Sequence, residues 1–486
     1  MSTLLRSIFS ILSGKAAGII ISLAFTPILV RIISQEQYGL YVSVLAGFSI
    51  FALLAKGGLF DSSLKIIAEN IKNQTTASDI VSISVLISIA YGITAVSVAS
   101  LGILFEIVPS RYVSFVWILL IAVIFGNVFS IVKGAFYGQQ REHVAEILNI
   151  GRRVFYVVVG LALAYIGYDL IGLFTAYSIS FVVIGVLGFI LLSRYFRFSV
   201  PSTKSIRRHG REIAAFGGFQ MIGGLSAAFL YKSDILLVEY FQTSTATALY
   251  NSAIVPAEMI WFVPSVIQMA FLQHTANLWA EDDIEEINVQ IRTGIKYSIL
   301  ALTLFGVGLF ALAEPFLQVY FGGDYVAAAD TLRLLIIGTF FFGISRVIVP
   351  VFQATGWVKH TELMTVGALL VNVLLNIILI PQYGIIGAGI GTSISYVMLF
   401  VGNICIWFYS PFEMVSLRWT ASLVLAQSVF TVVFLAIVSI IETSPLISLF
   451  VFPPSGLVLF ISTNVVFGHI PIQELRYQIK SVTERI

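Results

Sequence analysis

Residues 80–108, IVSISVLISIAYGITAVSVASLGILFEIV, are apolar along their whole length and carry a single charge, at Glu106. A run of about 20 apolar residues is long enough to cross a bilayer as a helix. In hydrocarbon every backbone N–H and C=O must be paired, which only helices and closed barrels achieve. A barrel strand would alternate apolar and polar residues over about 10 positions. This stretch does not alternate, so it predicts a transmembrane helix.

The rest of the chain has the same character. It has 486 residues, of which 58% are hydrophobic and 11% charged, and its mean hydropathy is +0.98. Soluble domains have about 25% charged residues, so the solvent of this chain must be largely lipid. We predict an all-α integral membrane protein of about fourteen transmembrane helices. The predicted spans are 8–33, 39–60, 80–108, 113–137, 144–167, 170–192, 213–240, 247–271, 293–320, 331–354, 362–380, 385–409, 420–441 and 446–468.

The distribution of positive charge predicts the orientation, since Lys and Arg gather on the cytoplasmic side. If the N-terminus is cytoplasmic, the outer segments hold only Arg31, Arg111 and Arg333, and the inner segments hold many more basic residues. We therefore expect a multi-pass protein of the cell membrane with both termini in the cytoplasm. The first apolar stretch runs to Ile33 without a cleavage site, so it is expected to be a retained helix.

An internal repeat predicts two halves. Tyr168–Gly172 and Ser178–Ser180 resemble Tyr383–Gly387 and Ser393–Ser395, and both copies begin on the same predicted side of the membrane. Parallel repeats of this kind occur in transporters, with the site between the halves. We expect an N-lobe at 1–192, a basic cytoplasmic linker at 193–212 and a C-lobe at 213–410. Residues 411–486 would add two helices outside the repeat and a cytoplasmic tail.

Signals for catalysis are absent. The five histidines are scattered without metal-ligand spacing, and no glycine-rich phosphate-binding loop is present. The net charge of +2 gives no reason to expect a nucleic-acid partner. We therefore expect a transporter rather than an enzyme, with no catalytic residue, no metal and no cofactor.

Ionisable residues inside spans are costly in lipid and indicate function. The basic candidates for a cationic cavity that attracts phosphate are Lys56, Arg152, Arg153, Lys232 and Arg346. The alternative is that basic side chains extend to the interface; this is the favoured interpretation for Lys15 and Lys133. For Lys56 and Arg346, which lie deeper, both interpretations stay open. Adjacent residues point about 100° apart on a helix, so at most one of Arg152 and Arg153 need face a cavity.

Two acidic residues are candidates for ion coupling. Glu258 lies about eleven residues into the eighth predicted span, close to the midplane, between Pro256 and Pro264, which could kink the helix. It suits a proton or sodium relay, and a structural, hydrogen-bonded role is an equal alternative. Asp234 lies toward the outer end of its span and could instead neutralise Lys232.

The chain resembles the polysaccharide transporter family, the Wzx-type oligosaccharide flippases of the multidrug/oligosaccharidyl-lipid/polysaccharide exporter superfamily. The stretches that carry the resemblance are Pro27–Ser34 with Tyr38–Tyr41, Asp234–Val238 with Ala248–Tyr250, and Phe321–Gly322, Tyr325, Ala354–Gly356, Asn372, Ile380–Gly384 and Gly387–Ala388. The resemblance implies two six-helix lobes related by a pseudo-twofold axis along the membrane normal, plus two extra C-terminal helices. It also implies transfer of a polyprenyl-phosphate- or polyprenyl-pyrophosphate-linked oligosaccharide to the outer leaflet, with membrane lipids and glycan assembly enzymes as further partners. Members of the family carry a neutral or acidic residue near position 56, so Lys56 is a departure.

Two other functions remain open. A drug/cation antiporter of the same superfamily would use acidic cavity residues, and basic residues outnumber acidic ones within these spans. A membrane glycosyltransferase or ligase would carry a long outer loop with clustered catalytic residues, whereas the predicted outer loops are short.

Overall fold

The computed structural model describes residues 3–198 and 200–471, and every regular element in these two ranges is a helix. The predicted all-α class is therefore confirmed. The chain divides into two compact units, Met1–Leu236 and Leu237–Ile486. The predicted domain boundaries at 192 and 212 stay a prediction, and the part of the predicted cytoplasmic tail beyond residue 471 lies outside the described residues.

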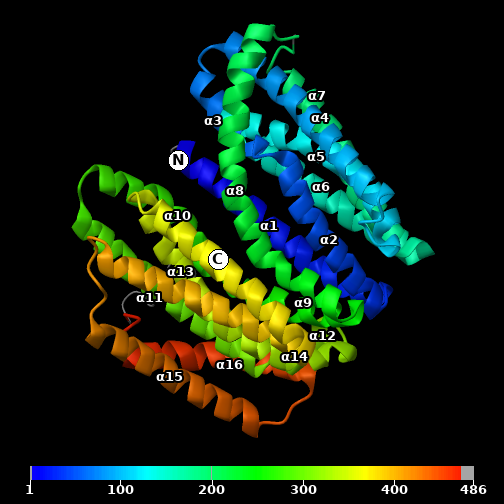
Figure 1. Cartoon of the computed structure of the whole chain (residues 1–486). Coiled ribbons are helices and arrows are strands. Elements are labelled where there is room, and N and C mark those ends of the chain that lie inside the picture. Colours follow the sequence, from blue (N-terminus) through cyan, green and yellow to red (C-terminus); the bar gives the residue numbers. More distant parts are fainter. Residues whose placement is uncertain (1–2, 199, 472–486) are drawn as a thin grey trace, which may run out of the picture. The chain divides into compact units, whose positions relative to one another are not determined.

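The first unit is built from eight helices and one short π-helical turn, η1 (Figure 1). They are α1 (Thr3–Ile32), α2 (Gln35–Lys56), α3 (Leu59–Asn70), α4 (Gln74–Leu104), α5 (Ser110–Gly138), α6 (Glu142–Leu163), η1 (Ala164–Tyr168), α7 (Asp169–Ser193) and α8 (Thr203–Phe241), which continues into the second unit. Residues 203–212 of the predicted linker are thus helical, because the Lys and Arg residues in this stretch are good helix formers. Ser34 starts α2 with a reciprocal capping box to Gln37.

A break divides the predicted span 39–60. Helix α2 ends at Lys56, and Gly57 and Gly58 both adopt left-handed backbone conformations, with φ of 53° and 68°. Glycine is the residue that adopts this conformation without steric cost. At Gly58 a Cβ atom would lie 2.0 Å from the carbonyl oxygen of Gly217, so α8 approaches the break backbone to backbone. Helix α2 therefore covers residues 39–56 of the predicted span, and Gln35–Asn70 is one candidate membrane span with a break in it.

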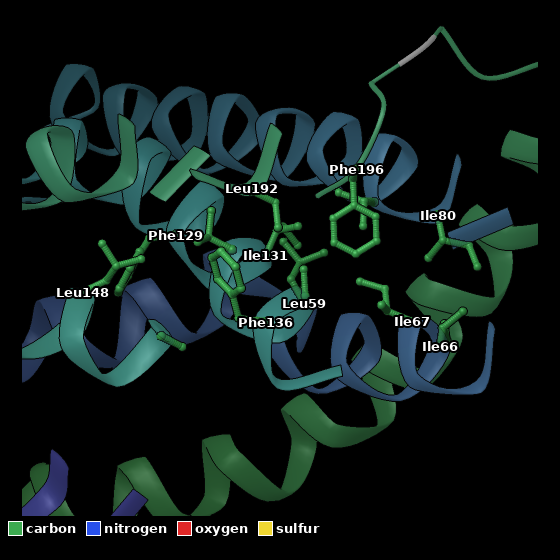
Figure 2. Packing of buried hydrophobic residues seen from close by; sticks show 14 of the residues in the cluster. Leu59, Ile66, Ile67, Ile80, Phe129, Ile131, Phe136, Leu148, Leu192 and Phe196 are labelled. Atoms are coloured by element: carbon green, nitrogen blue, oxygen red, sulfur yellow. The ribbon is translucent and has the colours of Figure 1, made fainter. Parts of the chain in front are cut away.

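The core of the first unit lies among α3, α4, α5, α6 and α7. Figure 2 shows its buried side chains interleaving from these helices and from the segment after α7. Those labelled are Leu59, Ile66, Ile67, Ile80, Phe129, Ile131, Phe136, Leu148, Leu192 and Phe196. This packing fixes the helices that carry the polar residues described below.

The second unit continues with the end of α8, eight further helices and one 3₁₀ turn, η2 (Figure 1). They are α9 (Ser244–Met259), α10 (Phe262–Ala280), α11 (Ile284–Ala311), α12 (Ala313–Tyr320), η2 (Gly323–Ala328), α13 (Ala329–Ala354), α14 (Val358–Tyr409), α15 (Leu417–Ile440) and α16 (Pro445–Val466). Helices α9 and α10 meet at a bend of 52°, which is the kink expected between Pro256 and Pro264. Helices α15 and α16 share an apolar cluster with α11 that includes Leu300, Phe430 and Phe460.

Ten helical stretches of the described residues are long and apolar enough to cross a membrane, or eleven when α9 and α10 count as one. Two of these stretches, Glu142–Ser193 and Val358–Tyr409, have 52 residues each. A straight helix of that length would measure about 78 Å, more than twice the hydrocarbon thickness of about 30 Å. Each contains a glycine with non-helical backbone, Gly167 (φ 96°) and Gly384 (φ 57°, ψ −135°), so each is two helices in series. The count of fourteen spans and the two-lobe layout stay predictions.

Candidate functional site

A cavity of about 130 Å³ lies in the first unit between α2, α5 and α7. Its wall is mostly apolar and carries a small number of polar groups. The lining residues are Phe48, Ser49, Ala52, Lys56, Ala122, Val123, Gly126, Asn127, Tyr177 and Phe181. Lys56 is thus placed at a cavity, as one of its two predicted roles requires, and none of these lining residues is acidic.

Lys56 is the last residue of α2 and is half-buried. The C-terminal end of a helix carries partial negative charge, which stabilises a cation in the last turn. The break at Gly57 and Gly58 therefore gives Lys56 favourable electrostatics inside an apolar stretch. Lys56 also lies within electrostatic range of Arg152 and Lys133, so positive charges gather here.

Asn127 on α5 connects the break to the cavity. Its Nδ2 donates to the carbonyl oxygen of Ala55 at 2.9 Å and to that of Ser88 at 3.4 Å. The side chain is 1% exposed, and within the described residues its Oδ1 has no hydrogen-bond partner. A buried acceptor without a donor is unfavourable, so this amide beside the cavity is incompletely paired. Sequence analysis did not single out Asn127, because a lone amide in an apolar helix gives no signal of its environment.

The adjacent arginines of α6 take different directions, as expected. The Arg152 guanidinium lies 4.4 Å from the ring centroid of Phe181 and 5.9 Å from that of Tyr177, both residues of the cavity wall. Arg153 turns toward α1, where a Cβ atom at Gly18 would lie 2.5 Å from its Nη1. Arg152 thus stands behind the aromatic wall of the cavity and Arg153 does not line it.

A buried ion pair on α5 and α6 was missed by sequence analysis. Lys133 Nζ lies 3.4 Å from Glu146 Oε1, and the side chains are 23% and 8% exposed. The Tyr137 hydroxyl donates to the same oxygen at 2.7 Å. Lys133 is thus paired with a carboxylate, and its expected extension to the interface stays a prediction. Glu146 neutralises the charge of Lys133. This carboxylate therefore does not compensate the positive charges of Lys56 and Arg152.

The remaining candidates are not among the residues that line this cavity. Lys232 on α8 is half-buried, and Asp234 is 1% exposed with Oδ1 accepting from the Ile235 N–H at 2.8 Å. In the second unit, Glu258 is half-buried near the end of α9, one turn before the bend. Within the described residues, no group of three or more His, Cys, Asp or Glu side chains could hold a metal ion.

Arg346 on α13 is held at the α9–α10 bend. Its guanidinium lies 4.9 Å from the ring centroid of Trp261 and 5.4 Å from that of Phe342. One nitrogen donates to Gln268 Oε1 at 2.8 Å and to Ser265 Oγ at 3.3 Å. The Trp261 indole in turn donates to the Thr339 carbonyl oxygen at 2.8 Å. Arg346 is therefore oriented by aromatic and polar neighbours of its own unit, and is not merely extended to the interface.

Comparison with known families settles the class of this chain. Residues 4–272 match the profile of a family described as polysaccharide biosynthesis protein. The chain belongs to this family. Residues 221–378 also match the MatE family. The predicted membership in the multidrug/oligosaccharidyl-lipid/polysaccharide exporter superfamily is therefore confirmed.

This chain is also similar to individual known proteins. It is 23% identical over 457 residues to the probable low-salt glycan biosynthesis flippase Agl15 of Haloferax volcanii, covering 92% of each chain. It is 24% identical to an uncharacterized membrane protein of Methanocaldococcus jannaschii over 56% of this chain, and spans only 54% of that protein. The fold matches the lipid II flippase MurJ in an inward closed conformation with a TM-score of 0.71 at 13% identity, covering 95% of this chain and 99% of the other.

Proposed function

We propose that this protein is a flippase that moves a polyprenyl-phosphate- or polyprenyl-pyrophosphate-linked oligosaccharide from the cytoplasmic to the outer leaflet. The observation that carries the proposal is the cavity at the end of α2, where Lys56 and Asn127 offer a cation and an unpaired acceptor. A phosphate cannot cross hydrocarbon without compensation of its charge. Lys56, supported by Arg152, would supply that charge, and Asn127 would accept from a sugar hydroxyl.

The likeness to a probable glycan biosynthesis flippase over 92% of both chains supports the same substrate class. The predicted topology, with both termini and the basic segment 193–212 in the cytoplasm, would place Lys56 in the cytoplasmic half of its span, where the cargo is loaded. Glycan assembly enzymes on either face are the partners that this role requires. A transporter of this kind forms and breaks no covalent bond, so we assign no catalytic residue.

A drug/cation antiporter would need a carboxylate where the cation binds. None of the residues that line the described cavity is acidic, and Glu146 is engaged by Lys133 and Tyr137. The sign of the charge at the cavity therefore favours an anionic over a cationic cargo.

The decisive experiment follows a polyprenyl-pyrophosphate-linked oligosaccharide in vesicles that contain the purified full-length protein. A lectin added outside reports the sugar that reaches the outer leaflet. We expect flipping to be much faster than in protein-free vesicles. If the rate equals the protein-free rate while a fluorescent organic cation is transported, the antiporter is the correct function.

We further propose that Glu258 couples transport to a proton or sodium gradient, because it lies beside the α9–α10 bend. A small change in local charge there could shift α9 relative to α10. A difference of a few kcal/mol is enough to reverse the populations of two states. Glu258→Gln mimics the protonated side chain, so flipping by this variant should no longer respond to either gradient. Asp234→Asn is the parallel test for the second candidate. Wild-type flipping that ignores both gradients would remove the coupling role of both residues.

A further inference from the structure

A second cavity, of about 400 Å³, lies in the second unit, where the start of α15 meets the end of α16 and the middle of α11. It is independent of the cavity at Lys56. Its wall includes Lys296, Arg418, Trp419, Ser422, Phe467 and His469. These residues come from α11, from the start of α15 and from the turn after α16, and the three helices share an apolar cluster.

The charge in this cavity is positive. Lys296 on α11 and Arg418 on α15 bring two cations from different helices to one space, and no acidic residue is among those that line it. Arg418 lies in the first turn of α15, whose N-terminal end adds partial positive charge. His469 is 6% exposed, and its Nε2 lies 3.3 Å from the Ser422 hydroxyl. The wall of the cavity is therefore polar, and it combines the buried imidazole of His469 with the cations of Lys296 and Arg418.

Apolar residues lie next to those that line this cavity. Leu300 lies one turn beyond Lys296, and Leu423 lies one turn beyond Trp419; both belong to the buried cluster of α11, α15 and α16. Trp419 itself is half-buried, and tryptophan is enriched where hydrocarbon meets headgroups. Leu417, 85% exposed, and Val466, 82% exposed, flank the cavity with apolar surface. A ligand that fits both parts has an anionic head and an apolar tail.

We propose that this cavity binds the phosphate of an acidic membrane lipid headgroup on the side predicted to be cytoplasmic. Arg418 would grip two phosphate oxygens with its planar guanidinium, and Lys296 would add a point charge. Basic pockets between transmembrane helices on this side of a membrane have the chemistry that binds acidic headgroups. The acyl chains would lie along the apolar surface near Leu417 and Val466. The lipid acts here as a bound ligand of α11, α15 and α16 rather than as cargo.

The test uses the full-length protein, purified and delipidated in a neutral detergent. Short-chain phosphatidylglycerol, short-chain phosphatidylcholine and inorganic phosphate are titrated separately, and the midpoint of thermal unfolding is recorded. We expect phosphatidylglycerol to raise the midpoint, phosphatidylcholine to leave it unchanged, and inorganic phosphate to act only at much higher concentration. A ligand that binds the folded state alone produces such a shift.

Variants locate the effect. Arg418→Ala and Lys296→Ala should each weaken the apparent affinity for phosphatidylglycerol about tenfold, as loss of one charge-assisted hydrogen bond predicts. Lys359→Ala, which removes an exposed cation of α14 outside the cavity, should leave it unchanged. Because Arg418 is itself exposed, its variant should unfold at the wild-type midpoint without lipid. The proposal is overturned if both lipids act alike, if phosphate is as effective as phosphatidylglycerol, or if the two cavity variants bind phosphatidylglycerol as wild type does.

Discussion

Lys56 joins two properties that seldom coincide in an apolar helix, a positive charge and the end of the helix itself. The negative end of α2 stabilises the ammonium group at the wall of the cavity. The nearby charge of Arg152 acts in the opposite direction, since like charges repel. An anionic ligand would relieve this repulsion, so the binding of an anion is linked to the charge of Lys56.

Replacement of Lys56 tests that link. Lys56→Ala should lower the rate of oligosaccharide flipping by about tenfold or more, because a hydrogen bond to a charged group contributes roughly 1.5–3 kcal/mol. Lys56→Arg keeps the charge and should lose less. Lys72→Ala removes an exposed cation and serves as the matched control. The measurement is the lectin assay in vesicles, and unchanged flipping by Lys56→Ala would exclude a cargo contact at this residue.

The Lys133–Glu146 pair is a structural feature with a separate test. Glu146→Gln leaves the Lys133 ammonium without its counter-charge, and breaking a buried ion pair on one side is destabilising. Since Lys133 is 23% exposed, we expect a loss of about 3 kcal/mol in the free energy of unfolding, at the low end of that effect. Thermal unfolding in detergent measures it. Adding Lys133→Met should recover part of the loss; if it does not, the two charges are not coupled.

Single residues were predictable from sequence where burial alone identifies them. Lys56 and Arg346 lie deep within apolar stretches, and both have specific surroundings in the structure. Glu146 was missed because it was not considered as a partner of Lys133. A signal did exist. Lys133 lies six residues before Gln139, and Glu146 lies six residues after Gln140. The two glutamines lie in the turn between the antiparallel helices α5 and α6. Asn127 had no such signal, since its unpaired oxygen depends on three helices meeting.

At the scale of elements, α8 approaches the break between α2 and α3 closely. Two backbones touch there, because a Cβ atom at Gly217 would lie 2.5 Å from the carbonyl oxygen of Gly57. Backbone atoms cannot move aside as a flexible side chain can. The neighbouring Gly218 faces open space, with nothing within 4 Å of its Cβ position.

These neighbours provide a matched pair of substitutions. Gly217→Ala should destabilise the protein by about 1–3 kcal/mol through overpacking. Gly218→Ala should stabilise it by up to about 1 kcal/mol, because alanine is the better helix former. Both are measured as changes in the midpoint of thermal unfolding. Equal effects of the two substitutions would mean that α8 does not approach the break closely.

Elements were predicted well where proline or charge marked their ends. The bend between Pro256 and Pro264 and the interruption of α14 after Pro381 both followed from proline chemistry. The break at Gly57 and Gly58 did not, because two glycines within an apolar run equally indicate close helix packing. Here they serve both purposes. The start of α8 at Thr203 was also missed, since basic residues were taken for a loop.

At the scale of the whole molecule, the orientation in the membrane is the prediction that affects every other. Cys405 is the single cysteine of the chain, so Cys405→Ser gives a background free of thiols. In that background, Tyr168→Cys and Tyr383→Cys lie at the interruptions of the two 52-residue stretches and are 59% and 57% exposed in the wild-type chain. Both should react with a membrane-impermeant maleimide from outside intact cells, because each interruption is predicted to be an outer turn.

Arg208→Cys provides the opposite side of the same experiment. It should react only after the membrane is permeabilised, since the basic segment is predicted to be cytoplasmic. Labelling of Arg208→Cys in intact cells would reverse the orientation. The prediction of fourteen spans is wrong if Tyr168→Cys is labelled in intact cells and Tyr383→Cys is labelled only after permeabilisation.

The contacts between α1 and α6 also bear on how the chain is made. Glu146 packs against Gly14, and Arg153 packs against Gly18. These two charged side chains of α6 therefore depend on the space that glycines leave on α1. Residues 33–141 separate the two helices in the sequence. During synthesis α1 enters the bilayer long before α6 leaves the ribosome. It must wait beside the insertion machinery with its glycine face unfilled until α6 arrives. A bulky residue at Gly14 or Gly18 would therefore first impair the insertion of α6 and lead to early degradation of the chain. This would happen before the protein has folded, and so before a loss of transport could be measured.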